Sequence, residues 1–290
     1  MAKDVFYTKI SEMEPMMPAN IPMLEELAIE VIRKSAALSG ALHFVTRKSV
    51  VELVRTMNSY YSNLIEGHHA NPVDIEKALV NDYSHDSAQR ALQVESAAHV
   101  YVQRNLEERL SKDSTTDICG VDFLCWLHRE FYDRLPEEFL EVRFKGGQKK
   151  VRPGRLREDE VTIGHHLAPH SSQLSAFLKR FSDSYGNPAI GSVSKIIAAA
   201  ASHHRLAWIH PFLDGNGRVT RLFTHAFLIK AGVDGHGMWT VSRGFARNRD
   251  AYITALAGAD NHRQGDLDGR GNLSVKGLIS FCRFFLETAL

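Results

Sequence analysis

The sequence predicts a mainly α-helical protein with one small β-hairpin. Over most of the 290 residues, apolar side chains recur at intervals of three and four, which is the spacing of amphipathic helices. Residues 146–164 are the exception, because two short extended runs there flank a polar turn. The chain is long enough to bury a full core, as one large domain or two modest ones.

The N-terminal part should consist of helices after an irregular start. Met and Pro residues crowd the first 20 positions, and a helix is expected over 22–39, closed by Gly40. A second helix is expected over 50–64, with an inward apolar stripe formed by Val50, Val54, Met57, Tyr61 and Leu64. Asn71 and Pro72 are typical of a helix start, and the helical pattern then continues to about residue 110.

The remaining elements follow in the order helix, hairpin and helices. A helix is expected over 122–135. Two extended runs, 151–157 and 161–164, should form the hairpin and are joined by three acidic residues. Further helical segments are expected at 171–181, at 193–209, from residue 218 to Gly232, and at 248–259.

Charge and hydropathy argue against several classes of partner. The formal net charge is +1, so no strong field attracts nucleic acid or a membrane surface. No apolar run approaches the roughly 18 residues of a membrane span, and the N-terminus lacks the apolar core of a signal peptide. Three cysteines without zinc-type spacing favour free thiols in a reducing compartment. We therefore expect a cytoplasmic protein with no membrane contact and no direct nucleic-acid signal.

Residues 210–221, HPFLDGNGRVTR, gather the groups expected of a phosphate site. Gly215 and Gly217 lack a Cβ, so the backbone N–H groups can turn toward an anion, and Asn216 adds side-chain donors. The apolar spacing that follows predicts a helix beginning near Arg218, and a helix N-terminus with unpaired N–H groups binds phosphate. The segment therefore predicts a nucleotide-phosphate site.

Further side chains of the same stretch add cations, a carboxylate and a base. Arg218 and Arg221 are three apart and share one helical face, where both can bind phosphate oxygens. Asp214 is suited to hold Mg²⁺ that is bound through the same phosphates. His210 is the only group here that can accept a proton near neutral pH. A glycine-rich turn with solvated arginines is the alternative interpretation of the loop.

This run resembles, at every defined position, the signature of the Fic family (fido fold), H-x-F-x-[DE]-G-N-G-R-x-x-R. The resemblance implies a fido-type helical bundle and transfer of AMP from ATP to a hydroxyl side chain of a target protein. It implies His210 as the catalytic base, Asp214 as the metal ligand and Arg221 as the γ-phosphate ligand. The residues implied to surround the nucleotide are Asp214, Gly215, Asn216, Gly217, Arg218, Val219, Thr220 and Arg221.

Residues 62–67, SNLIEG, resemble the inhibitory motif of the same family, [ST]-x-x-x-E-[GN]. Ser62 and Glu66 lie four apart on one helical face, and Gly67 follows. The helix dipole disfavours a carboxylate in a last turn by about 0.3–1 kcal/mol, so Glu66 should either lie in water or pair with a cation. The resemblance implies that this cation is Arg221, that Glu66 obstructs the γ-phosphate, and that the inhibitory helix is N-terminal to the signature.

Two more segments resemble parts of the family's site. The first resembles the flap, whose exposed strand edge would hold the target segment beside the histidine, and consists of Val161, Thr162, Ile163 and Gly164. A plain surface hairpin is the alternative interpretation of that segment. The second resembles the wall of the adenine pocket and consists of Tyr252, Ile253 and Asp260. Ile253 stands where a second tyrosine is usual, which puts aromatic stacking on that side in doubt.

We divide the chain into three expected regions. Residues 1–110 form an N-terminal helical region with the inhibitory motif, residues 111–265 form the Fic core with flap and signature, and residues 266–290 form a C-terminal helix. The last run is apolar up to its end at Leu290. It leaves three alternatives open, namely packing on the core, pairing with another chain, or truncation before a further domain.

The combined expectation is a protein adenylyltransferase that uses ATP and Mg²⁺ and is inhibited by Glu66. Its partners would be ATP and a target protein with a Ser, Thr or Tyr hydroxyl, with self-modification and a homodimer left open. The alternatives are removal of AMP from a modified protein, transfer of the γ-phosphate, and a non-enzymatic nucleotide-binding regulator. Gly217 argues against γ-phosphate transfer, because such family members tend to carry a bulky or charged residue there, and His210 argues against a regulator.

Overall fold

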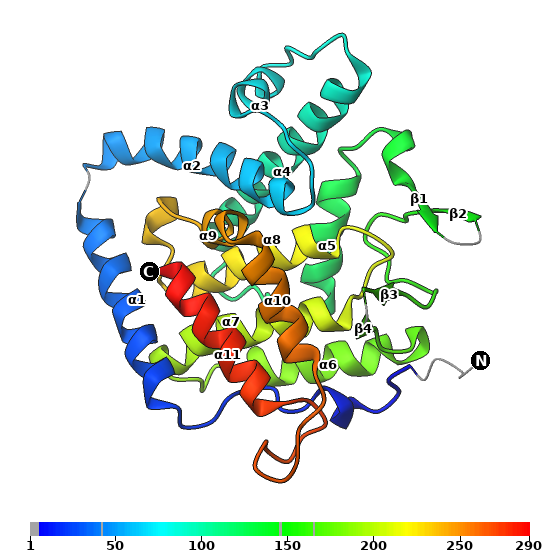
Figure 1. The fold of residues 1–290 in the computed structure, drawn as a ribbon. Coiled ribbons are helices and arrows are strands. Elements are labelled where there is room, and N and C mark those ends of the chain that lie inside the picture. Colours follow the sequence, from blue (N-terminus) through cyan, green and yellow to red (C-terminus); the bar gives the residue numbers. More distant parts are fainter. Residues whose placement is uncertain (1–5, 42, 145–146, 165) are drawn as a thin grey trace.

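The computed structural model describes residues 6–41, 43–144, 147–164 and 166–290. Helices dominate it, as predicted, and strands are few and short (Figure 1). The α-helices are α1 (Pro22–Gly40), α2 (Phe44–Ile65), α3 (Pro72–Leu79), α4 (Ser87–Lys112), α5 (Val121–Tyr132), α6 (Leu174–Tyr185), α7 (Ser192–Ile209), α8 (Asn216–Lys230), α9 (Val241–Arg247), α10 (Arg249–Asp260) and α11 (Val275–Ala289). Short 3-10 turns are η1 (Ile10–Met13), η2 (Glu137–Leu140), η3 (Ser171–Gln173) and η4 (Gly235–Gly237).

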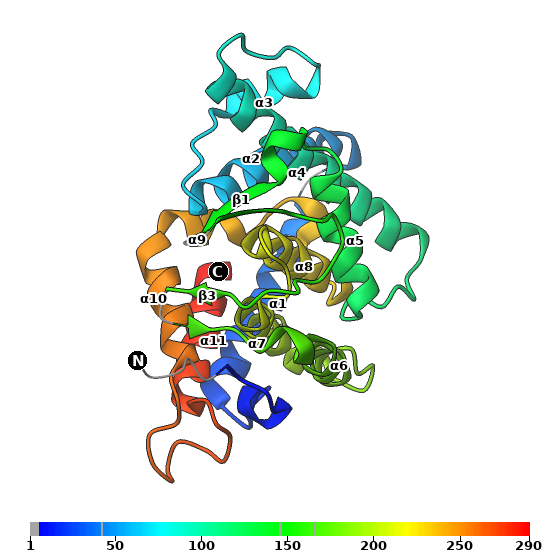
Figure 2. The ribbon, with the colours of Figure 1, turned by 90° about the vertical axis from the view of Figure 1, so that its right-hand side faces the viewer.

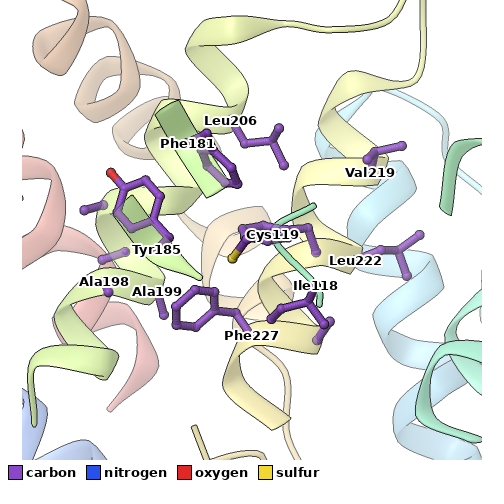
Figure 3. Packing of buried hydrophobic residues seen from close by; sticks show 14 of the residues in the cluster. Ile118, Cys119, Phe181, Tyr185, Ala198, Ala199, Leu206, Val219, Leu222 and Phe227 are labelled. Carbon is purple, nitrogen blue, oxygen red and sulfur yellow. The ribbon is translucent and has the colours of Figure 1, made fainter. Parts of the chain in front are cut away.

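Helices α7 and α8 form the centre of the molecule. Alanines 198–201 of α7 are completely buried, and their small side chains let neighbouring helices approach closely. Figure 3 shows Phe181 and Tyr185 of α6 packed with Leu222 and Phe227 of α8 around this part of α7. The loop between α7 and α8, which carries the signature, is therefore held by two helices that are themselves fixed in the core.

The buried face of α2 differs from the prediction. All five residues of the expected apolar stripe, from Val50 to Leu64, are only half-buried. The completely buried positions between residues 45 and 65 are instead mostly polar, and they are Thr56, Asn58, Ser59, Ser62, Asn63 and Ile65. The periodicity located the helix correctly but not its inward face, because α4 and α8 offer hydrogen-bond partners that make polar burial tolerable.

The helical pattern expected from residue 73 to residue 110 is interrupted. The structure has a short α3, a turn, and then the long α4, whose N-cap Asp86 accepts a hydrogen bond from the backbone N–H of Gln89. Asn71 caps α3 as predicted, by accepting from the backbone N–H of Val73. In Figure 1, α3 and the first turns of α4 project from the top of the molecule.

The predicted hairpin is wrong in its pairing. Residues 151–157 form turns and irregular backbone rather than a strand. The strands form two separate antiparallel pairs, β1 (Glu141–Phe144) with β2 (Gly147–Lys150), and β3 (Thr162–Ile163) with β4 (His166–Leu167). The short β3–β4 pair lies near the C-terminal end of α7 and beside α10 (Figure 2). The prediction therefore found β3 but gave it the wrong partner.

The C-terminal helix packs on the core. Its apolar face is fully buried against α10, α1 and α7, through Leu278, Phe281, Cys282, Phe285 and Leu286. Helix α9, just before α10, has no counterpart in the sequence prediction. The three cysteines are free thiols. Within the described parts of the chain, each helix is too short or too polar to cross a bilayer.

Candidate active site

His210 lies directly after the last residue of α7. Its backbone is left-handed, with φ 49° and ψ 62°, which is uncommon for a residue with a side chain and occurs most often at functional sites. Its Nδ1 is 3.3 Å from the carbonyl oxygen of Ala207, so that Nδ1 carries the proton and Nε2 is left as an acceptor. Burial lowers the pKa of His210 to about 4, so the ring is neutral at physiological pH.

Arg157 fixes the backbone around His210. Its guanidinium is completely buried and donates to the carbonyl oxygens of His210 (2.8 Å) and Pro169 (2.5 Å), which connects the end of α7 to the start of α6. Its own backbone N–H donates to Pro211. A cation at the C-terminal end of a helix satisfies carbonyls that lack partners there and opposes the helix dipole. The sequence predicts Arg157 only as part of an extended run and does not indicate this role.

The loop of the signature is closed by Asn216. Its Oδ1 accepts from the backbone N–H of Phe212 at 2.9 Å, and its Nδ2 donates to the carbonyl oxygen of Phe212 at 2.8 Å. These donors were expected to face an anion, and the structure uses them to hold the loop instead. Gly215 has φ 76° and lies against Tyr132, where an added Cβ would come within 2.7 Å of the ring. Only glycine fits that position.

Asp214 is positioned from α5. Its Oδ2 accepts a 2.6 Å hydrogen bond from the hydroxyl of Tyr132, and burial followed by the Asp214 charge raises the pKa of that phenol. His128, one helical turn earlier, accepts from the backbone N–H of Gly154 at Nδ1 and therefore donates from Nε2 to the carbonyl oxygen of Asp214 (3.3 Å). The Asp214 side chain remains 44% exposed, so it can still reach a ligand.

Arg221 contacts the end of α2, as the resemblance implied. Its Nε donates to the hydroxyl of Ser62 at 2.8 Å, and its Nη2 donates to the carbonyl oxygen of Ser62 and, at 2.6 Å, to Oε1 of Glu66. The Arg221 side chain is 2% exposed and the Glu66 side chain 34% exposed. Burial alone would raise the pKa of Glu66, but the charges of Arg221 and Arg218 outweigh it and lower that pKa.

The Glu66 carboxylate also covers the start of α8. A Cβ built on Gly217 would overlap its Oε1. The first N–H groups of a helix have no partner within the helix and carry partial positive charge, so an anion is stabilised there. Glu66 thus occupies the place at which a phosphate would meet the N-terminus of α8. Arg249 of α10 supports this arrangement by donating to the carbonyl oxygen of Ile65, the last residue of α2.

A cavity of about 260 Å³ connects these groups. From the signature it is lined by His210, Asn216, Gly217, Thr220 and Arg221, whereas Asp214, Gly215, Arg218 and Val219 are outside the lining. Val219 was expected near the nucleotide, but its side chain is buried in the hydrophobic core (Figure 3). Glu66 and Arg249 close one side of the cavity.

The residues expected around adenine line the same cavity but differ in availability. Tyr252 is 4% exposed, its ring stacks on Phe245 at 4.4 Å, and its hydroxyl is 2.8 Å from Nε2 of His203. Ile253 is 44% exposed and supplies an apolar surface rather than an aromatic one. Asp260 is 3.0 Å from Nε2 of His204, which orients its carboxylate.

The flap residues lie at the mouth of this cavity. Thr162 and Ile163 form β3, and Ile163 lines the cavity while remaining 38% exposed. Gly164 has φ 60° and lines the adjoining groove of about 930 Å³. Val161 is half-buried and precedes the strand. Both residues of β3 are therefore exposed, and Ile163 lines the same cavity as His210.

The partners of Arg218 are not evident from the sequence. Arg218 forms an ion pair with Glu95 of α4, and its guanidinium lies 4.9 Å from the centre of the Phe131 ring. Nδ1 of His68, just after the inhibitory motif, lies 2.5 Å from Oε2 of Glu95. Burial, followed by the Arg218 charge, lowers the pKa of His68. Neither Glu95 nor His68 stands out in the sequence, because each is a single polar residue within or beside an amphipathic helix.

The residues present suit a metal ion that is held mainly by a substrate. Among the described residues, no group of three His, Cys, Asp or Glu side chains could hold a metal ion by itself. Asp214 is one partly exposed carboxylate beside the start of α8. Mg²⁺ is commonly bound by one or two carboxylates, substrate phosphates and water, so this single carboxylate is compatible with it.

Comparison with known proteins agrees with the geometry. The family model described as Fic/DOC matches residues 118–228, which contain the signature. The structure is similar to a Fic family protein from Desulfovibrio desulfuricans G20, with a TM-score of 0.68 and 18% identity over 94% of this chain and 74% of that one. Residues 118–228 of the chain therefore form a Fic/DOC domain. A Fic domain containing signaling protein from Bacteroides thetaiotaomicron gives a TM-score of 0.63 at 16% identity, over 91% of this chain and 95% of that one.

Sequence relatives of this chain carry an activity in their names. The chain is 30% identical over 128 residues to "Protein adenylyltransferase Fic" of Drosophila willistoni and 29% identical to that of Drosophila erecta. Each match covers 42% of this chain, and the chain spans 26% of the length of either relative. The activity of these longer relatives therefore comes to this chain only as a proposal.

Proposed function

We propose that this Fic protein transfers AMP from ATP to a hydroxyl side chain of a target protein, and that Glu66 inhibits the transfer. The observation that carries the proposal is that His210, the N-terminus of α8 and Arg221 line one cavity. A base, an anion-binding helix start and a buried cation are the groups that phosphoryl transfer needs in one place. The names of the Drosophila relatives support this chemistry.

His210 acts as the general base. Its Nε2 removes the proton of the target hydroxyl as that oxygen forms a bond to the α-phosphorus, and the bond from the α-phosphorus to the bridging oxygen breaks to release pyrophosphate. Ala207 keeps the ring in the tautomer that has this nitrogen unprotonated. Phosphate anions beside the ring favour its protonated form, so substrate binding raises the basicity that burial has lowered.

The start of α8 and Arg221 bind the phosphates. The N–H groups of the first turn and the helix dipole stabilise phosphate oxygens, and Arg221 contributes a charge-assisted bond at the deep end of the cavity. Asp214 would hold Mg²⁺ through its exposed carboxylate, and the ion would supply neutralisation of charge on the phosphate oxygens. Tyr132 and His128 keep Asp214 in place for this purpose.

The edge of β3 holds the target. Its exposed backbone can pair with an extended segment, as strand addition does in other peptide-binding proteins. Ile163 of this strand lines the cavity that His210 also lines. A hydroxyl side chain of a segment paired there would point toward the base.

Glu66 competes with the substrate for Arg221. The carboxylate and a γ-phosphate are both anions, and both need the guanidinium of Arg221 and the space above Gly217. A charge-assisted hydrogen bond is worth about 1.5–3 kcal/mol, which corresponds to roughly a ten- to hundredfold change in populations. With Glu66 in place, ATP must displace it or bind in an unproductive position.

Labelled ATP tests the proposal. The Glu66→Gly protein is incubated with Mg²⁺ and ATP labelled at the α or the γ position, with a cell lysate as the source of targets. Label from α-labelled ATP on protein, absent in a Glu66→Gly, His210→Ala double variant, is the expected result. Protein label from γ-labelled ATP alone would instead indicate phosphate transfer, and no label from either would leave a nucleotide-binding regulator.

A further inference from the structure

Two of the groups around Arg218, Phe131 and Glu95, lie outside the Fic signature. Its side chain is 9% exposed, and burial lowers the pKa of its guanidinium to about 10. Phe131 of α5 packs against its face at 4.9 Å, and Nη1 contacts Oε1 of Glu95. Its Nη2 lies 3.7 Å from Oδ2 of Asp214, the expected metal ligand. Arg218 is thus held between an aromatic ring and two carboxylates.

Glu95 has no other role that its surroundings explain. It lies in the middle of α4, and its side chain is 5% exposed. One oxygen contacts Arg218, and the other is 2.5 Å from His68. A buried carboxylate is unfavourable unless it is paired and hydrogen-bonded, so both partners are needed to keep it there. Glu95 also lies outside residues 118–228, the part that matches the family.

The charges around the start of α8 show what Glu95 changes. Arg218 and Arg221 supply two positive charges, and Glu66, Glu95 and Asp214 supply three negative ones. Glu66 is 34% exposed and can move away, and Asp214 is suited to a metal ion. Glu95 is buried and stays. The negative charge of Glu95 therefore reduces the attraction of the site for phosphate, while its contact with Arg218 holds that cation in place.

We propose that Glu95 is the positioning residue of Arg218: it holds the guanidinium beside Asp214 at the start of α8, and its own negative charge weakens the binding of ATP. The inference rests on the proposed function, because it concerns the same phosphate site. Glu95 does not touch the substrate itself and acts through Arg218. Its removal should therefore change ATP affinity and turnover in opposite directions, which loss of structure does not do.

The test uses the Glu66→Gly protein as the parent, so that inhibition does not mask the effect. Glu95→Gln keeps the shape and one hydrogen bond but removes the charge. We expect its dissociation constant for Mg·ATP, measured by calorimetry, to fall about threefold because one anion is lost near the phosphates. We expect kcat to fall about tenfold, because the neutral amide no longer forms the ion pair that holds Arg218 in place.

Glu95→Asp tests the position of the carboxylate separately from its charge. It keeps the anion but retracts it by one methylene, so ATP affinity should stay within about twofold of the parent while kcat falls. Glu107→Gln is the matched control, because Glu107 is a largely buried carboxylate of the same helix that pairs with Arg55 and His225. It should lower the melting temperature and leave both constants within about twofold of the parent.

Two results would overturn the proposal. One is a Glu95→Gln protein with the kcat of the parent, and the other is a parallel loss of ATP affinity and kcat together with melting temperature. If Glu95→Gln does not fold, the kcat of Glu95→Asp decides in the same way. A parent that transfers no AMP at all defeats the proposed function instead, and the ATP affinities of the three proteins then still decide whether the Glu95 charge acts on the phosphate site.

Discussion

The two sides of the site are attached to the molecule by different chemistry. On one side, α7 and α8 carry His210 and the phosphate loop. Nine of the 13 buried residues of α7 are apolar, and so are six of the 12 buried residues of α8. On the other side, α2 carries Glu66, and its fully buried positions are mostly hydroxyls and amides. Ser59 donates to the carbonyl oxygen of Ser96, and Asn63 donates to the Ser96 hydroxyl.

This difference indicates which side can move. Water can replace the partner of a released hydroxyl or amide, so each such bond contributes only about 0.5–1.5 kcal/mol net. Exposing a buried apolar side chain to water costs about 0.8 kcal/mol of free energy for each CH₂ group, and release of α7 would expose many such groups. We infer that the catalytic side is rigid, and that α2 can detach with its hydrogen bonds transferred to water.

The largest expected effect tests the rigid side. In the Glu66→Gly background, His210→Ala should reduce AMP transfer by about 10²–10⁴-fold, the usual contribution of a general base. ATP affinity should stay nearly unchanged, because the histidine acts on the hydroxyl. Transfer is measured with α-labelled ATP, and His85→Ala, at an exposed histidine between α3 and α4, is the control. Transfer at the parental rate in His210→Ala would remove the base from the mechanism.

The second effect tests the movable side. Glu66→Gly should raise AMP transfer at least about tenfold over the unmodified protein, because it frees Arg221 from a charge-assisted bond. Arg221→Ala should not activate, since it removes both the inhibitory contact and the phosphate ligand. Glu76→Gly, at an exposed position of α3, controls for the effect of glycine on a helix. An unactivated Glu66→Gly protein that still binds ATP would show that the contact does not inhibit.

Much of the catalytic side was predictable from the sequence. The glycines, the histidine and the two arginines lie close together in the chain, so their spacing alone places them around one helix start. The contact of Glu66 with Arg221 followed from two separate motifs and is present. Asn71 at the start of α3 was found from cap chemistry, which is also local.

The misses share a physical cause, which is that they depend on contacts between distant segments. Glu95, His68 and Arg249 acquire their roles from side chains or carbonyls far away in the chain. The inward face of α2 was wrong because periodicity assumes that apolar residues are buried, whereas Asn58 finds buried polar partners on α4 and after η4. The β3 strand was paired with the wrong run because its true partner, His166–Leu167, is only two residues long.

A smaller effect sharpens the comparison on α2 itself. Asn58 donates to Gln103 at 2.7 Å and accepts from the hydroxyl of Thr240 at 2.6 Å. Asn58→Ala should weaken the attachment of α2 and raise AMP transfer about two- to fivefold, as expected for a loss near 0.5–1 kcal/mol. Hydrogen exchange should show faster opening of α2, with α7 unchanged. Asn105→Ala, which removes a contact between α4 and α5 only, is the control.

That variant also distinguishes detachment from general loosening. In the Glu66→Gly background, Asn58→Ala should give no further activation, because the group that inhibits is already absent. If Asn58→Ala activates equally in both backgrounds, α2 influences the site by some route other than Glu66. If exchange of α7 accelerates together with α2, the two sides are not independent.

The smallest expected effect concerns pH and again separates the two sides. A base must be unprotonated, and burial lowers the pKa of His210 to about 4, so kcat/KM should fall only as the pH drops through about 4. In the Glu66→Gly protein, with Mg²⁺ saturating, we expect less than a twofold change between about pH 8 and pH 5.5. In the unmodified protein the same range should not release Glu66 either, because Arg221 and Arg218 lower its pKa against the effect of burial and keep it ionised. Both proteins are compared at each pH, with circular dichroism to verify the fold.

A loss of kcat/KM centred near pH 6.5 in Glu66→Gly would mean that His210 is solvated in the working enzyme. Activation of the unmodified protein on mild acidification would mean that protonation alone detaches α2.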